Sequence, residues 1–243
     1  MKVIGVIPAR FSSTRLKGKV LAMIDGKPMI QHVYERVRQS QLLNDVLIAC
    51  DDERVKKAAQ EFGAKVVMTD PNHVCGTDRI VEAVKDLNVD IVVNIQGDEP
   101  MIDPVIIDDL INALKENPDA PMATVIKKVT DSKDLDNPNI VKVVVDHEQT
   151  AIYFSRSKIP FNRAAGEYVY FKHLGIYAYT KEFLLKYAAL PKSKLEMAES
   201  LEQLRAVENG FKIKTVLTDI ETIGVDTPED LIKVEKLIQE RKR

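Results

Sequence analysis

The first segment of the chain that could carry chemistry is a basic loop, residues 7–19, with the sequence IPARFSSTRLKGK. Its polar and flexible positions are four cations, three hydroxyls and a glycine: Arg10, Arg15, Lys17, Lys19, Ser12, Ser13, Thr14 and Gly18. Guanidinium and ammonium groups are strong donors to phosphate oxygens. The segment matches neither GxxxxGK[ST] nor GxGxxG. We interpret it as a binding loop for a triphosphate, and a solvated basic loop is the simpler alternative.

Two aspartates have the chemistry of metal ligands. Asp98 follows the apolar run 91–95 after two turn-forming residues, and Asp226 follows a strand-like stretch in the same manner. Carboxylates of this kind suit Mg²⁺, which commonly uses one or two of them together with substrate phosphates. The alternatives are a turn residue for Asp98 and a helix N-cap for Asp226. From local sequence alone, capping is the better explanation of Asp226.

The elements that must position these residues alternate along the first half of the chain. Residues 3–7 and 91–95 are apolar runs without a polar face, which is typical of strands buried on both sides in a parallel sheet, and 46–50 and 66–68 are further predicted strands. Helices are predicted after Pro28, after Asp52 as N-cap with Gly63 as the stop, over about 78–87, and over 104–116. In such sheets, ligands bind beyond the carboxyl ends of the strands, where the basic loop and Asp98 fall.

The second half of the chain is less regular. Residues 141–145, 151–154 and 174–179 are predicted strands without regular intervening helices, and helices are predicted over 181–190 and about 197–209. A last strand, 213–217, precedes a helix that starts at Pro228. The predicted fold class is α/β, a mostly parallel sheet with helices on both faces and a mixed or antiparallel extension. We expect a single domain, residues 1–243, with a sub-lobe roughly within 122–210 that could form a homodimer interface.

Composition narrows the class of protein. The 243 residues are 45% hydrophobic, so a folded core is expected. The formal net charge of −2 gives no global attraction to nucleic acid or to an anionic membrane. Two cysteines are too few for a disulfide framework, and the four histidines lack metal-ligand spacing. No stretch has a membrane-spanning length. We expect a cytoplasmic protein with small-molecule partners, no nucleic acid partner and no membrane insertion.

Seven blocks in fixed order carry a resemblance to a known family. Besides the basic loop they are GTDR (76–79), QGDEPMI (96–102), YFSR (153–156), HLGIYAY (173–179), LEQLR (201–205) and GVDTPEDL (224–231). Together they resemble the CMP-Kdo synthetases, nucleotidyltransferases that activate an acidic sugar. Each block is weak by itself, and the ordered set is specific. The chain departs from the family pattern at Lys17 and Val20, where proline is usual, and at Cys75, where serine is usual.

The resemblance implies a Rossmann-like nucleotidyltransferase fold and a defined reaction. The anomeric hydroxyl of 3-deoxy-D-manno-octulosonate (Kdo) attacks the α-phosphorus of CTP, and pyrophosphate leaves. It implies that Asp98 and Asp226 hold Mg²⁺ and that Arg10, Arg15 and Lys19 stabilise the triphosphate. The implied CTP-binding set is Pro8, Ala9, Arg10, Ser12, Arg15, Lys19, Cys75, Gly76 and Arg79. The product would serve lipopolysaccharide biosynthesis.

The resemblance also implies a sugar site in the second half. Arg156 would bind the sugar carboxylate, and the hydroxyls would be read by Gln96, His173, Tyr177, Glu202 and Gln203. Plainer interpretations are an exposed helix face for Glu202 and Gln203, an inward aromatic for Tyr177 and a surface position for His173. Two rival functions stay open at this point. One is a cytidylyltransferase for sialic acid or an amino-substituted Kdo, and the other is a nucleotide-binding module without catalysis.

Overall fold

The structure is a computed structural model that describes residues 1–12, 16, 18–73, 75–164 and 166–240. The chain forms two compact units. The N-terminal unit comprises Met1–Asp108 and Glu221–Arg243, and the central unit comprises Asp109–Ile220. The expected sub-lobe at 122–210 falls within the central unit, and its assignment to sugar binding and dimerisation stays a prediction. Across the described residues, every helix is too short or too polar to cross a membrane.

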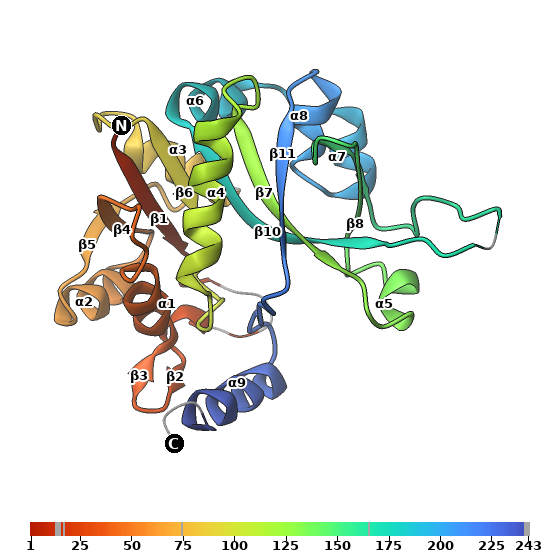
Figure 1. The fold of residues 1–243 in the computed structure, drawn as a ribbon. Helices are drawn as coiled ribbons and strands as arrows, with labels where there is room; N and C mark the ends of the chain where they lie inside the picture. The colour runs from red at the N-terminus through yellow and green to blue at the C-terminus, as the bar shows by residue number, and fades with distance from the viewer. Residues whose placement is uncertain (13–15, 17, 74, 165, 241–243) are drawn as a thin grey trace. The chain divides into compact units, whose positions relative to one another are not determined.

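The N-terminal unit is built on four parallel strands (Figure 1). They are β1 (Val3–Ala9), β4 (Asp45–Cys50), β5 (Lys65–Met68) and β6 (Ile91–Asn94), in the order β6-β1-β4-β5. The register pairs Ile7 with Ile48 between β1 and β4, and Gly5 with Val93 between β1 and β6. The side chains of β1 and β6 are buried on both faces, as their unbroken apolar runs require. The predicted parallel sheet is confirmed.

Helices of this unit begin and end where local chemistry dictates. In α1 (Met29–Val37), Ile30, Val33, Tyr34 and Val37 are all buried, as the i, i+3, i+4, i+7 spacing predicts. Asp52 caps α2 (Glu53–Glu61) by accepting a 2.9 Å hydrogen bond from the Arg54 amide. Gly63 follows at φ 79°, in the left-handed region that favours glycine. A short hairpin, β2 (Met23–Ile24) with β3 (Lys27–Pro28), was not predicted.

Three further predicted helices are present, one of them with shifted bounds. The helix predicted over about 78–87 is α3 (Gly76–Val84), which starts two residues earlier because Cys75 acts as its N-cap. The predicted helix at 104–116 is confirmed as α4 (Pro104–Glu116), and the boundary between the two units falls within it. The predicted last helix is confirmed as α9 (Pro228–Glu240), whose Val234 packs with Ile24, Met29 and Met101.

The central unit has a mixed sheet, which confirms the predicted extension. β7 (Met122–Lys128) pairs in parallel with β11 (Ile213–Thr218) and antiparallel with β10 (Phe171–Thr180). β8 (Lys142–Val145) pairs antiparallel with β10 and with β9 (Ala151–Ser155). The prediction omitted β7 and the short helix α5 (Lys133–Asp136). Helix α6 (Lys181–Ala189) was predicted and begins at the Thr180 cap.

The helix predicted over about 197–209 is wrong, because the segment forms two short helices. α7 (Lys194–Glu199) starts at a capping box made by Ser193 and Glu196, and it ends where Ser200 adopts φ 51°. α8 (Leu204–Glu208) follows after a turn. Glu202 and Gln203 lie in that turn, and Gln203 is 3% exposed. The interpretation of these two residues as an exposed helix face is therefore also wrong.

Candidate functional site

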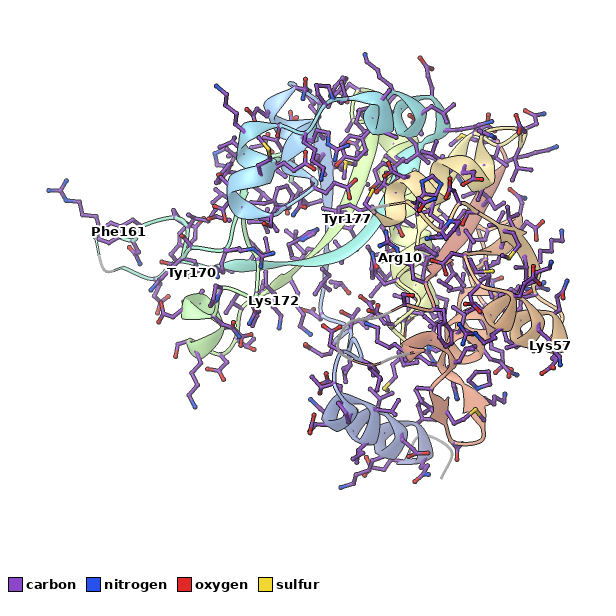
Figure 2. All side chains as sticks on the ribbon, turned by 180° about the vertical axis from the view of Figure 1, so that it is seen from behind. Arg10, Lys57, Phe161, Tyr170, Lys172 and Tyr177 are labelled. Atoms are coloured by element: carbon purple, nitrogen blue, oxygen red, sulfur yellow. The ribbon has the colours of Figure 1, made fainter. Side chains whose placement is uncertain are left out.

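A cavity of about 390 Å³ opens in the N-terminal unit at the carboxyl ends of β1 and β6 and the first turn of α3. Its lining residues are Pro8, Arg10, Ser12, Lys19, Val20, Gly76, Gln96, Gly97 and Asp98. Seven of the nine were predicted site residues, and Arg10 is labelled on its stick side chain in Figure 2. The parallel sheet therefore brings the basic loop, the α3 N-terminus and the segment after β6 to one place.

Gly97 allows the close approach of two of these segments. A Cβ added at this residue would lie 2.9 Å from the carbonyl oxygen of Pro8. Real Cβ atoms do not come so near a backbone oxygen, so only glycine lets the segment after β6 run this close to β1. Gly97 and Val20 were not predicted as site residues, although Gly97 stands inside the block QGDEPMI.

Lys19 joins the two predicted metal ligands. Its Nζ lies 2.6 Å from Oδ2 of Asp98 and 3.0 Å from Oδ1 of Asp226. Burial opposes the charge of the ammonium group, but the two carboxylates outweigh this effect and raise the pKa of Lys19. The residue stands at the start of a 3₁₀ turn, Lys19–Leu21, just after Gly18 at φ 67°. One cation therefore lies between two carboxylates that are 128 residues apart in sequence.

Asp226 is not the cap of α9. The capping residue is Thr227, whose Oγ1 accepts from the Asp230 amide while the Asp230 carboxylate accepts from the Thr227 amide at 2.9 Å. The carboxylate of Asp226 turns instead to Lys19. In addition, the Val225 amide donates to the Asp98 carbonyl at 2.9 Å, which ties the two carboxylate-bearing segments together. The capping interpretation of Asp226 is wrong.

The donor set of this pair fits a small hard cation. Carboxylate oxygens are the ligands that Mg²⁺ takes from proteins, and two of them suffice when phosphates supply the rest. The Lys19 ammonium nitrogen contacts both carboxylates at once. Asp98 and Asp226 are therefore close enough together to bind one cation. Among the described residues, no group of three or more His, Cys, Asp or Glu side chains is arranged to hold a metal. The pair therefore suits a metal that arrives with its own phosphate ligands.

Four other residues were also predicted to bind CTP: Ala9, Arg15, Cys75 and Arg79. Arg15 and Lys17 fall outside the described residues. Ala9 is buried within β1. Arg79 is 0% exposed, and its guanidinium pairs with Asp51 at 2.9 Å. Arg79 does not line the cavity, so its predicted contact with CTP stays a prediction while its structural contacts point inward.

Cys75 occupies the N-cap of α3. Its Sγ accepts a hydrogen bond from the Asp78 amide at 3.4 Å, the contact that a serine hydroxyl makes at a helix start. Thiol sulfur is a weak acceptor, so the cap is weaker than an oxygen would make it. The usual family residue, serine, therefore has a clear physical use at this position.

We expect Cys75→Ser to stabilise the fold slightly and to leave the KM for CTP the same or modestly lower. A hydroxyl caps better than a thiol, by up to about 1 kcal/mol of unfolding free energy. Chemical unfolding and CTP kinetics measure the two effects. Cys50→Ser is the matched control, because the Cys50 thiol is buried and its pKa is raised to about 11 by burial, so a hydroxyl there should destabilise. A folded Cys75→Ser protein without activity would contradict the capping role.

In the central unit, three predicted sugar-binding residues belong to an aromatic and polar cluster. His173 lies 5.0 Å from the Phe154 ring and 5.4 Å from the Tyr177 ring, and its Nε2 is 2.9 Å from Oγ1 of Thr124. Burial lowers the pKa of His173 to about 3. Burial, with a contribution from Glu202, raises the pKa of Tyr177. The surface interpretation of His173 is wrong, and both side chains are neutral hydrogen-bonding groups at neutral pH.

The turn between α7 and α8 is held against this cluster. The Tyr187 hydroxyl donates to the Glu202 carbonyl at 2.6 Å. A buried ion pair of 2.6 Å between Glu196 and Arg205 joins the two helices. Among the described residues, Nε2 of Gln203 is buried without a hydrogen-bond partner. A buried amide donor left unsatisfied is unfavourable, and an incoming polar ligand would satisfy it.

Arg156 holds backbone of the central unit with its guanidinium. Nε donates to the Glu199 carbonyl at 2.7 Å, and the two terminal nitrogens donate to the carbonyls of Pro138 and Ser200 at 2.9 and 3.3 Å. A guanidinium has five N–H donors, so these contacts use three of them. Arg156 therefore fixes the end of α7 and keeps two donors for another acceptor.

The low pKa of His173 predicts acid sensitivity. Its folded pKa is about 3, below the ordinary value of 6.5, so the unfolded chain binds a proton that the folded chain does not. Stability present above pH 6.5 is therefore lost as the pH falls from 6.5 towards 3. We expect His173→Gln to reduce the slope of unfolding free energy against pH by up to about one proton in this window. The exposed His147→Gln is the control, and an unchanged slope in His173→Gln would contradict the expectation.

Asp51 is a residue of the site region that the sequence pattern did not single out. It stands directly after β4, as Asp98 stands after β6, and its carboxylate contacts both the Phe11 amide and Arg79. The rule that ligands gather beyond the carboxyl ends of parallel strands would have pointed to Asp51 as it pointed to Asp98.

Comparison with known proteins covers both units. The family model described as cytidylyltransferase matches residues 4–216. The 3-deoxy-manno-octulosonate cytidylyltransferase of Solibacter usitatus is 53% identical over 98% of this chain and 95% of its own length. The 8-amino-3,8-dideoxy-manno-octulosonate cytidylyltransferase of a Shewanella species is 50% identical over 97% of this chain and 98% of its own length. A solved structure of a CMP:2-keto-3-deoxy-manno-octonic acid synthetase complexed with CTP matches with a TM-score of 0.96 at 47% identity, covering 99% of this chain and 100% of that chain.

Proposed function

This chain belongs to the cytidylyltransferase family of nucleotidyltransferase enzymes, and from that membership we propose that it transfers CMP from CTP to Kdo. The product is CMP-Kdo, and pyrophosphate is released. One observation supports this most strongly: a cavity with basic side chains, in which Lys19 stands between Asp98 and Asp226. A triphosphate needs cations and a metal site side by side, and both lie in the N-terminal unit.

The cavity residues would bind different parts of the nucleotide. Arg10 and Lys19 neutralise the triphosphate and the charge that develops on the leaving pyrophosphate. Ser12 and the first turn of α3 at Gly76 add hydrogen-bond donors. The anomeric oxygen of the sugar forms the new bond to the α-phosphorus as the bond from that phosphorus to the bridging oxygen breaks, and the hydroxyl proton leaves to solvent. Catalysis then rests on positioning and charge neutralisation.

Asp98 and Asp226 would hold Mg²⁺. When bound, the ion supplies charge neutralisation of the phosphates and lowers the pKa of a hydroxyl group near it. Lys19, which contacts both carboxylates, is within reach of the same phosphates. None of the described residues is required as a general base on this proposal.

The acceptor sugar would bind residues of the central unit. The residues we propose for it are Arg156, His173, Tyr177, Glu202 and Gln203. Arg156 has two N–H donors left for the sugar carboxylate, and the unsatisfied Nε2 of Gln203 suits a hydroxyl. Neutral His173 and Tyr177 act as hydrogen-bonding partners and not as proton carriers.

Further properties follow from the same proposal. We expect a cytoplasmic homodimer whose product enters lipopolysaccharide biosynthesis. The connection between β9 and β10 carries exposed apolar side chains, with Phe161 87% exposed at the end of the arm in Figure 2 and Val169 53% exposed. We propose that these exposed apolar side chains form part of the dimer interface. Sedimentation of the protein and of Phe161→Ser tests the dimer.

The decisive experiment supplies the protein with CTP, Mg²⁺ and Kdo. We expect pyrophosphate release only when the sugar is present, and a product with the mass of CMP-Kdo. Pyrophosphate release without sugar, or no release with any acidic sugar, would exclude this activity. ATP, GTP and UTP in place of CTP test the choice of base.

A second acceptor is supported by one comparison. The Shewanella relative at 50% identity is named for 8-amino-3,8-dideoxy-manno-octulosonate. The two sugars differ at one exocyclic substituent, so sites for them share most contacts. We propose Kdo as the main substrate, since the Solibacter relative at 53% is named for it. The ratio of kcat/KM for the two sugars decides between them, and sialic acid completes the panel.

A further inference from the structure

Asp51 connects the basic loop to α3 through one carboxylate. Its Oδ1 accepts a hydrogen bond from the Phe11 amide at 3.1 Å, and its Oδ2 accepts one from the Arg79 guanidinium at 2.9 Å. The Asp51 side chain is 11% exposed, and it does not line the cavity. Asp51 thus does not line the cavity itself, but it holds the basic loop, whose residues Arg10 and Ser12 do.

Arg79 fixes the position of this carboxylate. It is wholly buried, and its other contact is a hydrogen bond to Oγ1 of Thr69. Its Nε is buried without a hydrogen-bond partner among the described residues. A buried guanidinium needs a counter-charge, and Asp51 supplies it in the described part of the chain. The carboxylate cannot move away from Arg79 without leaving a buried charge uncompensated.

Phe11 is held on its other sides as well. Its carbonyl accepts from the Gly18 amide at 3.1 Å, which closes the loop at its base. The Arg54 guanidinium stacks over the Phe11 ring at 3.4 Å from the centroid. Phe11 stands between Arg10 and Ser12, and both of these line the cavity. The place of the Phe11 amide therefore determines where Arg10 and Ser12 present their donors.

We propose that Asp51 and Arg79 are a positioning pair for the nucleotide loop, which sets the affinity for CTP through Phe11 without touching the nucleotide. This inference rests on the proposed function, because it assumes that the cavity binds CTP. On this proposal Arg79 fixes the carboxylate of Asp51, and nucleotide binding depends on Asp51 as well as on the residues that line the cavity. Because the pair acts on the loop proposed for the triphosphate, we expect its effect to fall mainly on CTP.

The test compares Asp51→Asn, Arg79→Met and the double variant with the intact protein. Asparagine keeps the size of the side chain but removes the charge opposite Arg79. We expect Asp51→Asn to weaken CTP binding by about tenfold or more, measured by calorimetry, and to change the KM for Kdo by less than about twofold. Glu53→Gln is the matched control, because it removes a neighbouring carboxylate that is exposed and pairs with Lys56, away from Phe11.

The double variant separates positioning from simple loss of stability. Removing both buried charges restores much of the stability that a single change costs, since no charge is left unpaired. Positioning predicts that the melting temperature recovers while CTP binding stays weak, because asparagine without Arg79 no longer fixes the position of the Phe11 amide. Recovery of CTP binding together with stability would overturn the proposal, and so would equal losses for CTP and Kdo. If Asp51→Asn does not fold, the double variant distinguishes the two explanations by the same two readouts.

Failure of the proposed function has a different signature. An intact protein that binds no CTP would refute the nucleotide site itself. An intact protein that binds CTP, with Asp51→Asn and the double variant binding it equally well, would refute only the positioning pair. Hydrogen exchange of the Phe11 and Gly18 amides in the nucleotide-free protein adds a readout without substrate, and both amides should exchange faster in Asp51→Asn.

Discussion

Asparagine in place of Asp98 or Asp226 is expected to lower turnover by about a hundredfold or more and to raise the Mg²⁺ concentration that half-saturates the enzyme. Even partners that only orient metal ligands are worth about 10- to 100-fold, and these two carboxylates would be ligands. Each substitution keeps the shape of the side chain and removes a charge that Lys19 now balances. The measurement is turnover against Mg²⁺ concentration at saturating CTP and Kdo.

The double variant Asp98→Asn/Asp226→Asn tests whether the two residues serve one ion. Groups that act as a unit are strongly non-additive, so the double change should cost little beyond the worse single change. Additive losses would show that the two carboxylates act separately. Near wild-type activity in Asp226→Asn would defeat the shared-metal assignment outright.

Asp230→Ala provides the matched control for Asp226→Asn. Asp230 lies four residues along and makes the cap contacts with Thr227, so its loss should reduce stability by about 1 kcal/mol. Its carboxylate also accepts a 3.1 Å hydrogen bond from the Asp226 amide but does not contact Lys19, so the Mg²⁺ dependence should change much less than in Asp226→Asn. The pair of variants therefore separates a capping effect on stability from a metal effect on turnover.

The sequence predicts the N-terminal unit well because its signals are local. Doubly buried strands appear as unbroken apolar runs, and Asp52 and Gly63 mark the ends of α2 at the residues where the structure has them. Asp98 could be found because it follows such a run after only two turn-forming residues. The buried strands, the ends of α2 and the position of Asp98 all depend on residues that are close in sequence, which is why the sequence alone predicts them.

The central unit is predicted less well because its decisive contacts are not local. The apolar spacing of residues 197–209 fits one helix, but Ser200 takes a left-handed backbone and Arg156 binds the Ser200 carbonyl from 44 residues away. The true cap of α9 was missed for a related reason. Asp226 and Thr227 are both suitable capping residues, and the contact of Asp226 with Lys19, 207 residues distant, decides between them.

Arg156→Ala is expected to raise the KM for Kdo by roughly ten- to a hundredfold and to leave the KM for CTP nearly unchanged. Loss of a charged hydrogen-bond partner costs about 1.5 to 3 kcal/mol. The guanidinium has two N–H donors beyond those that hold backbone carbonyls, and a carboxylate accepts two parallel hydrogen bonds. Steady-state constants for both substrates measure the effect.

Two further variants show whether Arg156 acts directly on the sugar. Arg156→Lys keeps the charge but cannot both bind a carboxylate through a fork and hold the carbonyls of Pro138, Glu199 and Ser200, so an intermediate KM for Kdo is expected. Lys158→Ala removes a nearby cation from the same segment and should leave both constants as they are. If Arg156→Ala weakens the use of CTP and Kdo equally, in step with a lower melting temperature, its part is to hold the turn after α7. A loss confined to Kdo, with lysine intermediate and Lys158→Ala silent, places the guanidinium on the sugar carboxylate.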